Sequence, residues 1–158
     1  MADLNPALVP LSLYIHMPWC VRKCPYCDFN SHAVPDGKLS LALEESYLQA
    51  LVADFKTQLD FAQGRQIHSV FIGGGTPSLI SAQGYQWLFA KLKQLIVFEP
   101  NCEITLEANP GTLEHDPFIG YLQAGINRLS IGVQSFNSAH LQKLGRIHSN
   151  EDALNAIH

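Results

Sequence analysis

Three cysteines, Cys20, Cys24 and Cys27, lie within eight residues. Thiolates are soft ligands, and three of them can hold three irons of an iron–sulfur cube while the fourth iron stays open to a ligand that is not protein. Zinc is the simpler alternative, because Cys24 and Cys27 have zinc-like spacing and His16 or His32 would complete four ligands with Cys20. The spacing therefore predicts a metal centre, and a cluster would do its chemistry at the open corner.

The fourth cysteine, Cys102, lies far from the others at the start of an apolar run. It is predicted to be a small buried side chain rather than a ligand. Because three of the four thiols crowd one loop, the pattern indicates metal binding in a reducing compartment rather than two disulfides.

The composition is that of a globular chain. The 158 residues are 47% hydrophobic and 15% charged, which suits one domain with a substantial core. The formal net charge of −4, with no basic run longer than Arg22-Lys23, argues against a nucleic-acid surface. The sequence has no basic leader region and no apolar run near the ~20 residues of a membrane span. We expect a cytoplasmic protein with no transmembrane segment and no nucleic-acid partner.

Strand and helix patterns alternate along the chain, and these elements must position the cysteines. Apolar or alternating runs predict strands at 13–16, 68–72, 103–107 and 128–133. Between them, helical spacing predicts one long helix carrying Leu48, Leu51, Val52, Phe55 and Leu59, and another carrying Tyr85, Leu88, Phe89, Leu92 and Leu95. This order predicts an α/β fold with a parallel sheet and right-handed crossovers.

A short third helix is expected after the third strand. Asp116 is its predicted N-cap, Pro117 lies in its first turn, and Gly125 ends it; its predicted buried face is Phe118, Tyr121 and Leu122. The segment 31–39, which contains proline and glycine, is predicted to be a surface loop.

The last segment also has a helical pattern. Asn150 is the predicted N-cap, and an apolar stripe begins with Ala153, Leu154 and Ile157. This helix has only begun when the sequence stops at His158, and four strands are too few to close a barrel. We therefore expect the chain to be a fragment of a larger protein.

Each predicted strand runs into a loop rich in polar residues or glycine. The first leads to the cysteines and the second to Gly73-Gly74-Gly75-Thr76-Pro77-Ser78. The third ends at Glu107, before Ala-Asn-Pro-Gly-Thr, and the fourth at Gln134-Ser135-Phe136. Because the carboxyl ends of parallel strands meet at one edge of a sheet, these loops are expected to form a single site.

These motifs resemble the radical S-adenosylmethionine (SAM) superfamily. Cys-x-x-x-Cys-x-x-Cys with Tyr26 before the last cysteine, followed by the Gly-Gly-Gly-Thr-Pro run, is similar to its signature. Within it, the closest likeness is to the oxygen-independent coproporphyrinogen III oxidase (dehydrogenase) family, and there to the haem chaperones. The resemblance implies a partial (β/α)6 TIM-like barrel of which this chain is about the first four βα units. Residues 1–158 would be the radical SAM core domain, truncated at its C-terminus, with the C-terminal domain absent.

The resemblance also implies roles for individual residues. Cys20, Cys24 and Cys27 would ligate three irons of a [4Fe-4S] cluster, and SAM would chelate the fourth through its amino and carboxylate groups. Arg146 would pair with that carboxylate. The other residues that match cofactor contacts are Tyr14, Tyr26, Gly74, Gly75, Thr76, Glu107 and Gln134. One electron from the reduced cluster would cleave SAM to a 5′-deoxyadenosyl radical; no catalytic residue is assigned beyond this cofactor site.

Two departures within the family favour a haem chaperone, which binds haem and transfers it to an acceptor protein. The resemblance implies an additional cysteine in the dehydrogenases at the position of Phe29. It also implies an acidic-Pro-Arg sequence in them where this chain has Asn109-Pro110-Gly111. The alternative is the dehydrogenase itself, which converts propionates of coproporphyrinogen to vinyl groups, so enzyme activity stays open. Haem or a porphyrinogen would be the small-molecule partner, and a flavodoxin or ferredoxin the electron donor. Since no histidine follows a Cys-x-x-Cys, no haem ligand can be named.

Simpler interpretations of the same residues remain. The glycine run alone is equally a tight strand-to-helix turn. Glu107 and Gln134 alone are polar residues at exposed strand ends. Arg146, just after Gly145, also suits the end of a short helix.

Overall fold

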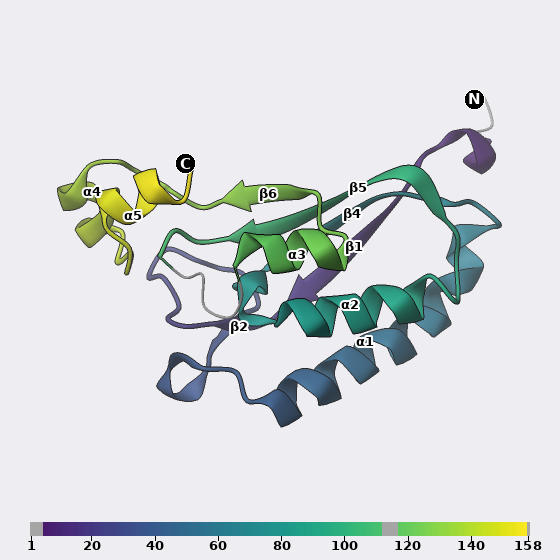
Figure 1. The fold of residues 1–158 in the computed structure, drawn as a ribbon, viewed down its shortest axis with the longest axis horizontal. Coiled ribbons are helices and arrows are strands. Elements are labelled where there is room, and N and C mark those ends of the chain that lie inside the picture. Colours follow the sequence, from purple (N-terminus) through teal and green to yellow (C-terminus); the bar gives the residue numbers. More distant parts are fainter. Residues whose placement is uncertain (1–4, 112–116, 158) are drawn as a thin grey trace.

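Figure 1 shows the chain as a computed structural model, which describes residues 5–111 and 117–157. Four parallel strands form a sheet in the order β1-β4-β5-β6. The strands are β1 (Leu11–Met17), β4 (Ile67–Gly74), β5 (Phe98–Ala108) and β6 (Arg128–Ile131). A parallel α/β sheet is confirmed, and all four strands direct their carboxyl ends to the same edge.

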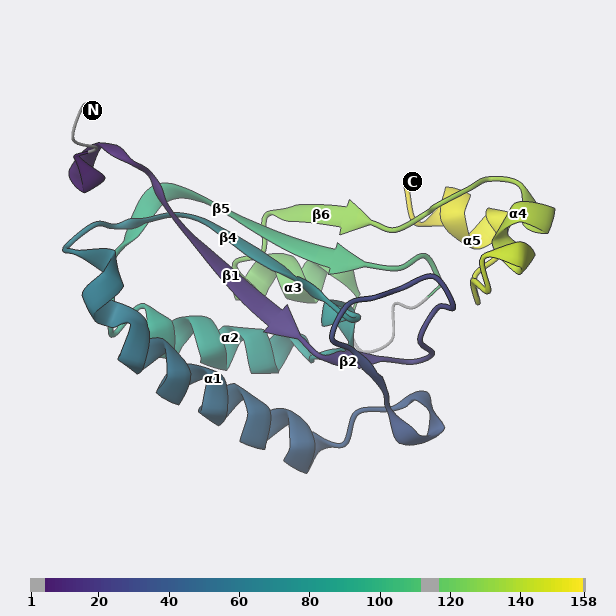
Figure 2. The same ribbon diagram turned by 180° about the vertical axis from the view of Figure 1, so that it is seen from behind.

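Three helices cover one face of this sheet in both views (Figures 1 and 2). They are α1 (Leu41–Ala62), α2 (Ala82–Leu92) and α3 (Phe118–Ala124), and α2 lies against both of the others. Two short helices, α4 (Ser138–Lys143) and α5 (Asn150–Asn155), lie beyond the carboxyl end of β6. Single turns occur at η1 (Pro6–Leu8), η2 (Pro35–Gly37) and η3 (Pro77–Leu79). Among the described residues, no helix is long and apolar enough to cross a membrane.

The core lies between the sheet and the helices, and it supports the loop after β4 from below. Ile72, Leu106 and Tyr85 are fully buried there. The Tyr85 hydroxyl donates to the carbonyl of Pro77 at 2.7 Å, and that of Tyr121 contacts the carbonyl of Ser78 at 2.9 Å. Burying side chains of this size contributes about 2 kcal/mol each. The turn after the glycine run is therefore fixed by the helices beneath it.

Most of the segment 31–39 is exposed, as predicted for a surface loop, but Ser31, Val34 and Leu39 are buried and anchor it. A two-residue strand, β3 (His32–Ala33), pairs with β2 (Trp19–Cys20), and Val34 is buried in the core. The amide of Val34 donates to the carbonyl of Cys20 at 2.9 Å. The segment thus returns across the first cysteine, a tertiary contact that local turn signals do not reveal.

Several helix details also differ from expectation. The helix α3 buries Tyr121 and Ala124, whereas Leu122 is 57% exposed. Pro117 occupies its N-cap position rather than its first turn. Asp116 lies outside the described residues, so its predicted cap is not tested.

The helix α2 ends at Leu92, before Leu95, and β6 ends at Ile131 rather than at residue 133. Ser149, not Asn150, caps α5, and it forms a capping box with Asp152. Ser149 is the cap because its hydroxyl oxygen accepts a hydrogen bond from the Asp152 amide, while the Asp152 carboxylate accepts one from the Ser149 amide. Of the predicted apolar stripe on α5, Ala153 is buried but Leu154 and Ile157 are exposed.

Candidate functional site

One cavity of about 360 Å³ lies at the carboxyl edge of the sheet, and all three clustered cysteines line it. Cys20 is buried at the end of β2, while Cys24 and Cys27 are partly exposed in the loop that follows. All of them are free thiols, as is the buried Cys102, which does not line the cavity. Figures 1 and 2 show this loop at the carboxyl end of the sheet, around the β2 label.

Ten of the eleven residues predicted for the site line this cavity. Besides the cysteines they are Tyr26, Gly74, Gly75, Thr76, Glu107, Gln134 and Arg146. Tyr14 is the exception: its ring stacks on Phe71 with 6.4 Å between ring centres, and its hydroxyl lies 3.0 Å from Nδ1 of His16. Its cofactor contact stays a prediction.

The glycine run is explained by packing as much as by any ligand. A Cβ on Gly74 would lie 2.6 Å from the His16 ring, and one on Gly75 would collide with the carbonyl oxygen of Trp19. Two backbone bonds of 2.6 Å join the same segments, from the Gly75 amide to Met17 and from the Thr76 amide to Trp19. The glycines thus let the loop after β4 lie directly on the start of the cysteine loop, and Gly74 also needs its positive φ of 108°.

Arg146 reaches back from the segment after α4 and joins three other loops. Its Nη2 donates to Oδ1 of Asn109 and, at 2.9 Å, to the carbonyl of Gly132. Its Nη1 lies 3.4 Å from Sγ of Cys24 and 3.5 Å from the Tyr26 hydroxyl. The alternative that Arg146 merely stabilises the end of α4 is wrong, because its guanidinium extends across the cavity edge to these groups.

The guanidinium is suited to an anionic ligand. Its Nε is buried and has no hydrogen-bond partner among the residues that the structure describes. Its acceptors are neutral, and within the described ranges no carboxylate forms an ion pair with it. A carboxylate bound here would gain a charge-assisted hydrogen bond. The residues present therefore fit the carboxylate of an amino-acid cofactor beside three thiols.

Glu107 supplies a carboxyl group at the end of β5. The Gly74 amide donates to its Oε2 at 3.3 Å, and a Cβ on Gly73 would approach that oxygen to 2.9 Å. Burial raises the pKa of Glu107 above its ordinary value, and the Gly74 hydrogen bond only partly offsets this. Glu107 is half-buried rather than an exposed strand end, which suits it to accept a hydrogen bond from a ligand cation.

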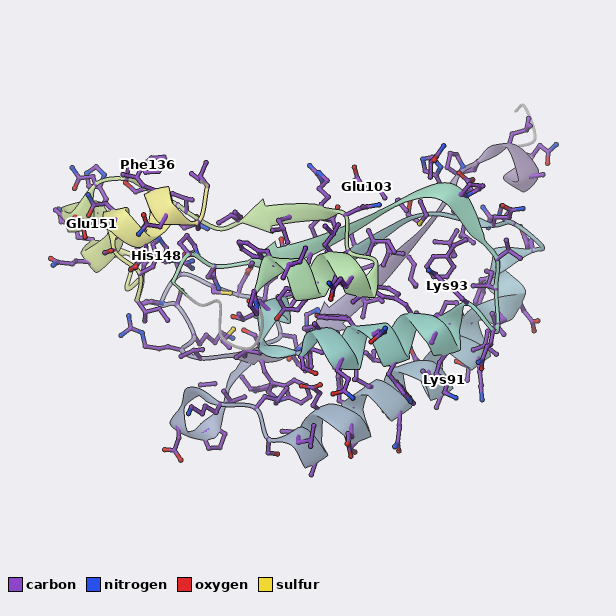
Figure 3. All side chains as sticks on the ribbon, viewed as in Figure 1. Lys91, Lys93, Glu103, Phe136, His148 and Glu151 are labelled. Atoms are coloured by element: carbon purple, nitrogen blue, oxygen red, sulfur yellow. The ribbon has the colours of Figure 1, made fainter. Side chains whose placement is uncertain are left out.

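Gln134 follows β6 in a left-handed conformation, with φ of 63°. Such a conformation is uncommon outside glycine and costs about 1 kcal/mol or more. His148 supports this turn: its Nε2 donates to the carbonyl of Val133 at 3.1 Å. Figure 3 shows His148 beside α5, at the carboxyl end of the sheet. Burial lowers the pKa of His148, so the neutral ring is favoured in the folded protein.

His16 is already engaged by protein groups, which counts against it as a zinc ligand. Across residues 5–111 and 117–157, no three His, Cys, Asp or Glu side chains converge closely enough to bind one ion. Both ring nitrogens of His16 are engaged, with the Tyr14 hydroxyl and with the carbonyl of Asn30 at 2.8 Å. In a cube each cysteine would bind a separate iron, so the three thiols need only surround the one cavity that they line.

Other cavity residues were not predicted from the sequence to contact the cofactor. Asn109, Gly132 and Arg22 all line the cavity, and Arg22 donates to the carbonyl of Gly145. Asn109 lies two residues after the predicted strand 103–107, so extending the strand-end argument by two residues finds it. Gly132 lies inside the predicted strand 128–133 and follows the strand only because β6 ends at Ile131. Arg22 has no such signal, since it lies between cysteines and acts through a contact 123 residues away.

Comparisons with known proteins show what this chain is similar to. The profile of the Radical SAM superfamily matches residues 14–158. The protein named Heme chaperone HemW of Haemophilus influenzae is 54% identical, with 96% of this chain and 40% of the relative covered. Its namesake in Escherichia coli is 51% identical, with 94% and 38% covered. The chain thus spans about two fifths of the length of these relatives.

A solved structure is also similar. It is coproporphyrinogen III oxidase (HemN) from Escherichia coli, described as a radical SAM enzyme, with a TM-score of 0.78 and 30% identity over 91% of this chain and 32% of that one. The profile covers nearly the whole sequence and includes the three cysteines, the glycine run and Arg146. This chain therefore belongs to the radical SAM superfamily.

Proposed function

We propose that the cavity binds a [4Fe-4S] cluster through Cys20, Cys24 and Cys27 and SAM at the remaining iron. The observation that carries this proposal is the convergence of the three thiols with Arg146 and Glu107 on one cavity. When bound, these cofactors would supply one-electron reduction of the SAM sulfonium, which breaks its bond to the 5′ carbon and gives methionine and a 5′-deoxyadenosyl radical. The chain's part is to bind the cofactors, to orient them and to exclude water from the cavity.

The residues divide this work by their chemistry. Arg146 has a charge without a carboxylate partner in the described ranges and a buried Nε, so it suits the carboxylate of SAM. Glu107 suits a ligand N–H or hydroxyl, and Gln134 offers an amide from the neighbouring strand end. Gly74 and Gly75 hold the cysteine loop against β4, which places the thiols beside these groups.

We further propose that the protein is a haem chaperone, with haem as cargo that it hands to an acceptor protein. The two bacterial relatives reported above carry that name at 54% and 51% identity. Phe29 supports the proposal. It lines the cavity at the position where the dehydrogenase pattern has an additional cysteine, and phenylalanine cannot do thiol redox chemistry. A flavodoxin or ferredoxin would be the electron donor. The free thiols fit a reducing compartment, which for this proposal is the cytoplasm.

The second candidate is oxygen-independent coproporphyrinogen III dehydrogenase. The structural likeness to the Escherichia coli coproporphyrinogen III oxidase favours it, since both folds would hold the same cofactors. This candidate makes the site an enzyme that removes two propionate carboxyl groups by oxidation, whereas a chaperone leaves the porphyrin unchanged. In either case we propose that residues 1–158 are part of the radical SAM core domain.

An anaerobic comparison separates the two. The chain is reconstituted with iron and sulfide, titrated with haem, and separately incubated with coproporphyrinogen III, SAM and a reductant; the Escherichia coli oxidase is the positive control. Stable haem binding without product supports the chaperone. Formation of protoporphyrinogen, with activity lost in Cys24→Ser, would establish the dehydrogenase instead.

A further inference from the structure

Asn109 links the loops that surround the cavity. It follows β5 and lines the cavity wall, where its Nδ2 donates to Oγ1 of Thr76 at 3.4 Å and its Oδ1 accepts from Nη2 of Arg146. Gly132 makes room for it, because a Cβ there would lie 2.9 Å from Oδ1 of Asn109. One amide therefore connects the loop after β4 with the arginine that follows α4.

These bonds determine how the guanidinium is oriented. With Nη2 held by Asn109 and the Gly132 carbonyl, Nη1 is left facing Sγ of Cys24 at 3.4 Å and Nε is left without a partner among the described residues. Because Asn109 is a neutral acceptor, it fixes the position of Arg146 without cancelling its charge. An aspartate would fix the same nitrogen but pair with the charge.

We propose that Asn109 is a positioning residue, which holds Arg146 so that one guanidinium serves both the sulfur of a cluster ligand and the carboxylate of SAM. This inference rests on the proposed cofactor site. It assigns to Asn109 two measurable properties, the affinity for SAM and the reduction potential of the cluster.

The direction of each effect follows from electrostatics. A hydrogen bond from a cation to a cluster sulfur stabilises the more electron-rich, reduced cluster and so raises its potential. If Asn109→Ala releases Arg146, the potential becomes more negative and the reduced fraction at a fixed ambient potential falls several-fold. The affinity for SAM falls about tenfold, the size expected for a misplaced hydrogen bond to a charged group.

The test uses the cluster-loaded chain and a matched asparagine. Asn127 braces β5 from outside the cavity: its Oδ1 accepts from the Ile104 amide at 2.8 Å and its Nδ2 donates to the Cys102 carbonyl at 3.0 Å. Asn109→Ala and Asn127→Ala are compared by urea unfolding, SAM titration and a redox titration of the cluster followed by electron paramagnetic resonance (EPR) without SAM. Arg146→Ala and the double variant complete a mutant cycle.

We expect Asn109→Ala to change both properties at unchanged iron content, and Asn127→Ala to change stability alone. In the Arg146→Ala background, Asn109→Ala should shift the potential no further, because it acts through the arginine. The inference is overturned if the wild type binds cluster and SAM but Asn109→Ala matches it, or if the two substitutions are additive. A wild type that binds neither cofactor overturns the proposed function together with this inference.

Discussion

At the scale of single residues, the cavity places a cation and a carboxyl group beside three thiols. The acceptors that Arg146 contacts are a neutral amide and a carbonyl, so no anion offsets its charge there, and Glu107 is half-buried beside the glycine run. Both groups are costly to bury. The Nε of Arg146 has no hydrogen-bond partner among the described residues, and burial raises the pKa of Glu107. Polar groups buried at such a cost in a cavity are typical of binding sites.

Glu107→Gln tests the electrostatic part of this description. Because burial raises the pKa of Glu107 in the folded state, the folded chain binds this proton more tightly than the unfolded chain does. The stability from this group is full below the unfolded pKa and is lost as pH rises through the folded pKa. The variant should therefore gain in free energy of unfolding relative to wild type as pH rises from about 4 to about 7.

Urea unfolding of the cluster-free chain across this pH range measures the effect. Glu45→Gln, on the exposed surface of α1, is the control and should follow wild type. Parallel pH profiles for Glu107→Gln and wild type would show that burial does not disfavour this carboxylate. In the loaded protein, Glu107→Gln is expected to weaken SAM binding, because the amide carries no charge.

At the scale of elements, the cysteine loop depends on the loop after β4 that packs against it. Gly75→Ala forces a Cβ into the Trp19 carbonyl and within 2.9 Å of the Met17 carbonyl oxygen. We expect a loss of about 2 kcal/mol in stability, typical of overpacking, and a large loss of cluster uptake because Cys20 is displaced.

Gly64→Ala is the matched control for Gly75→Ala. Gly64 has φ of 76°, and a Cβ there would meet nothing within 4 Å. It should cost about 1–2 kcal/mol from backbone strain alone, with normal iron and sulfide content after reconstitution. Equal cluster loading in the two variants would mean that the close contact does not position the thiols.

Two serine caps should differ in strength. Ser149 caps the exposed helix α5, whereas Ser81 caps α2 and also donates from its hydroxyl to the buried carboxylate of Glu44 at 2.5 Å. Ser149→Ala is expected to cost about 1 kcal/mol, the usual value of a cap. Ser81→Ala should cost roughly 2–3 kcal/mol, because it also removes a donor from a buried charge. Urea midpoints of the two variants give the order, and a reversed order would refute this ranking.

At the scale of the whole molecule, helices cover one face of a four-stranded sheet, and the site lies at its carboxyl edge (Figure 2). This arrangement follows from the alternating strand and helix patterns, so the sheet, the long helices and the meeting of the strand-end loops were predictable from the sequence. The cysteines, Glu107 and Arg146 were predicted from the family resemblance, and all of them line the same cavity.

Other features were not predictable, because they depend on contacts between distant segments. The turn around Val34 looked like a loop, since its partner, Cys20, lies on another strand. Gly75 suggested a ligand, but its Cβ position is filled by the carbonyls of Met17 and Trp19. Asn109 was noted only as a departure from the dehydrogenase pattern, because its contact with Arg146, 37 residues away, appears only in the folded chain.

The central claim is that the three cysteines hold an open-cornered cluster to which SAM binds. The most direct test is EPR of the reduced, anaerobically reconstituted chain with and without SAM, together with metal analysis. About four irons per chain and a spectrum changed by SAM are predicted, with both lost in Cys24→Ser and kept in Cys102→Ser, whose thiol lies outside the cavity. A colourless protein that retains one zinc per chain, or a cluster whose spectrum SAM leaves unchanged, would contradict the account.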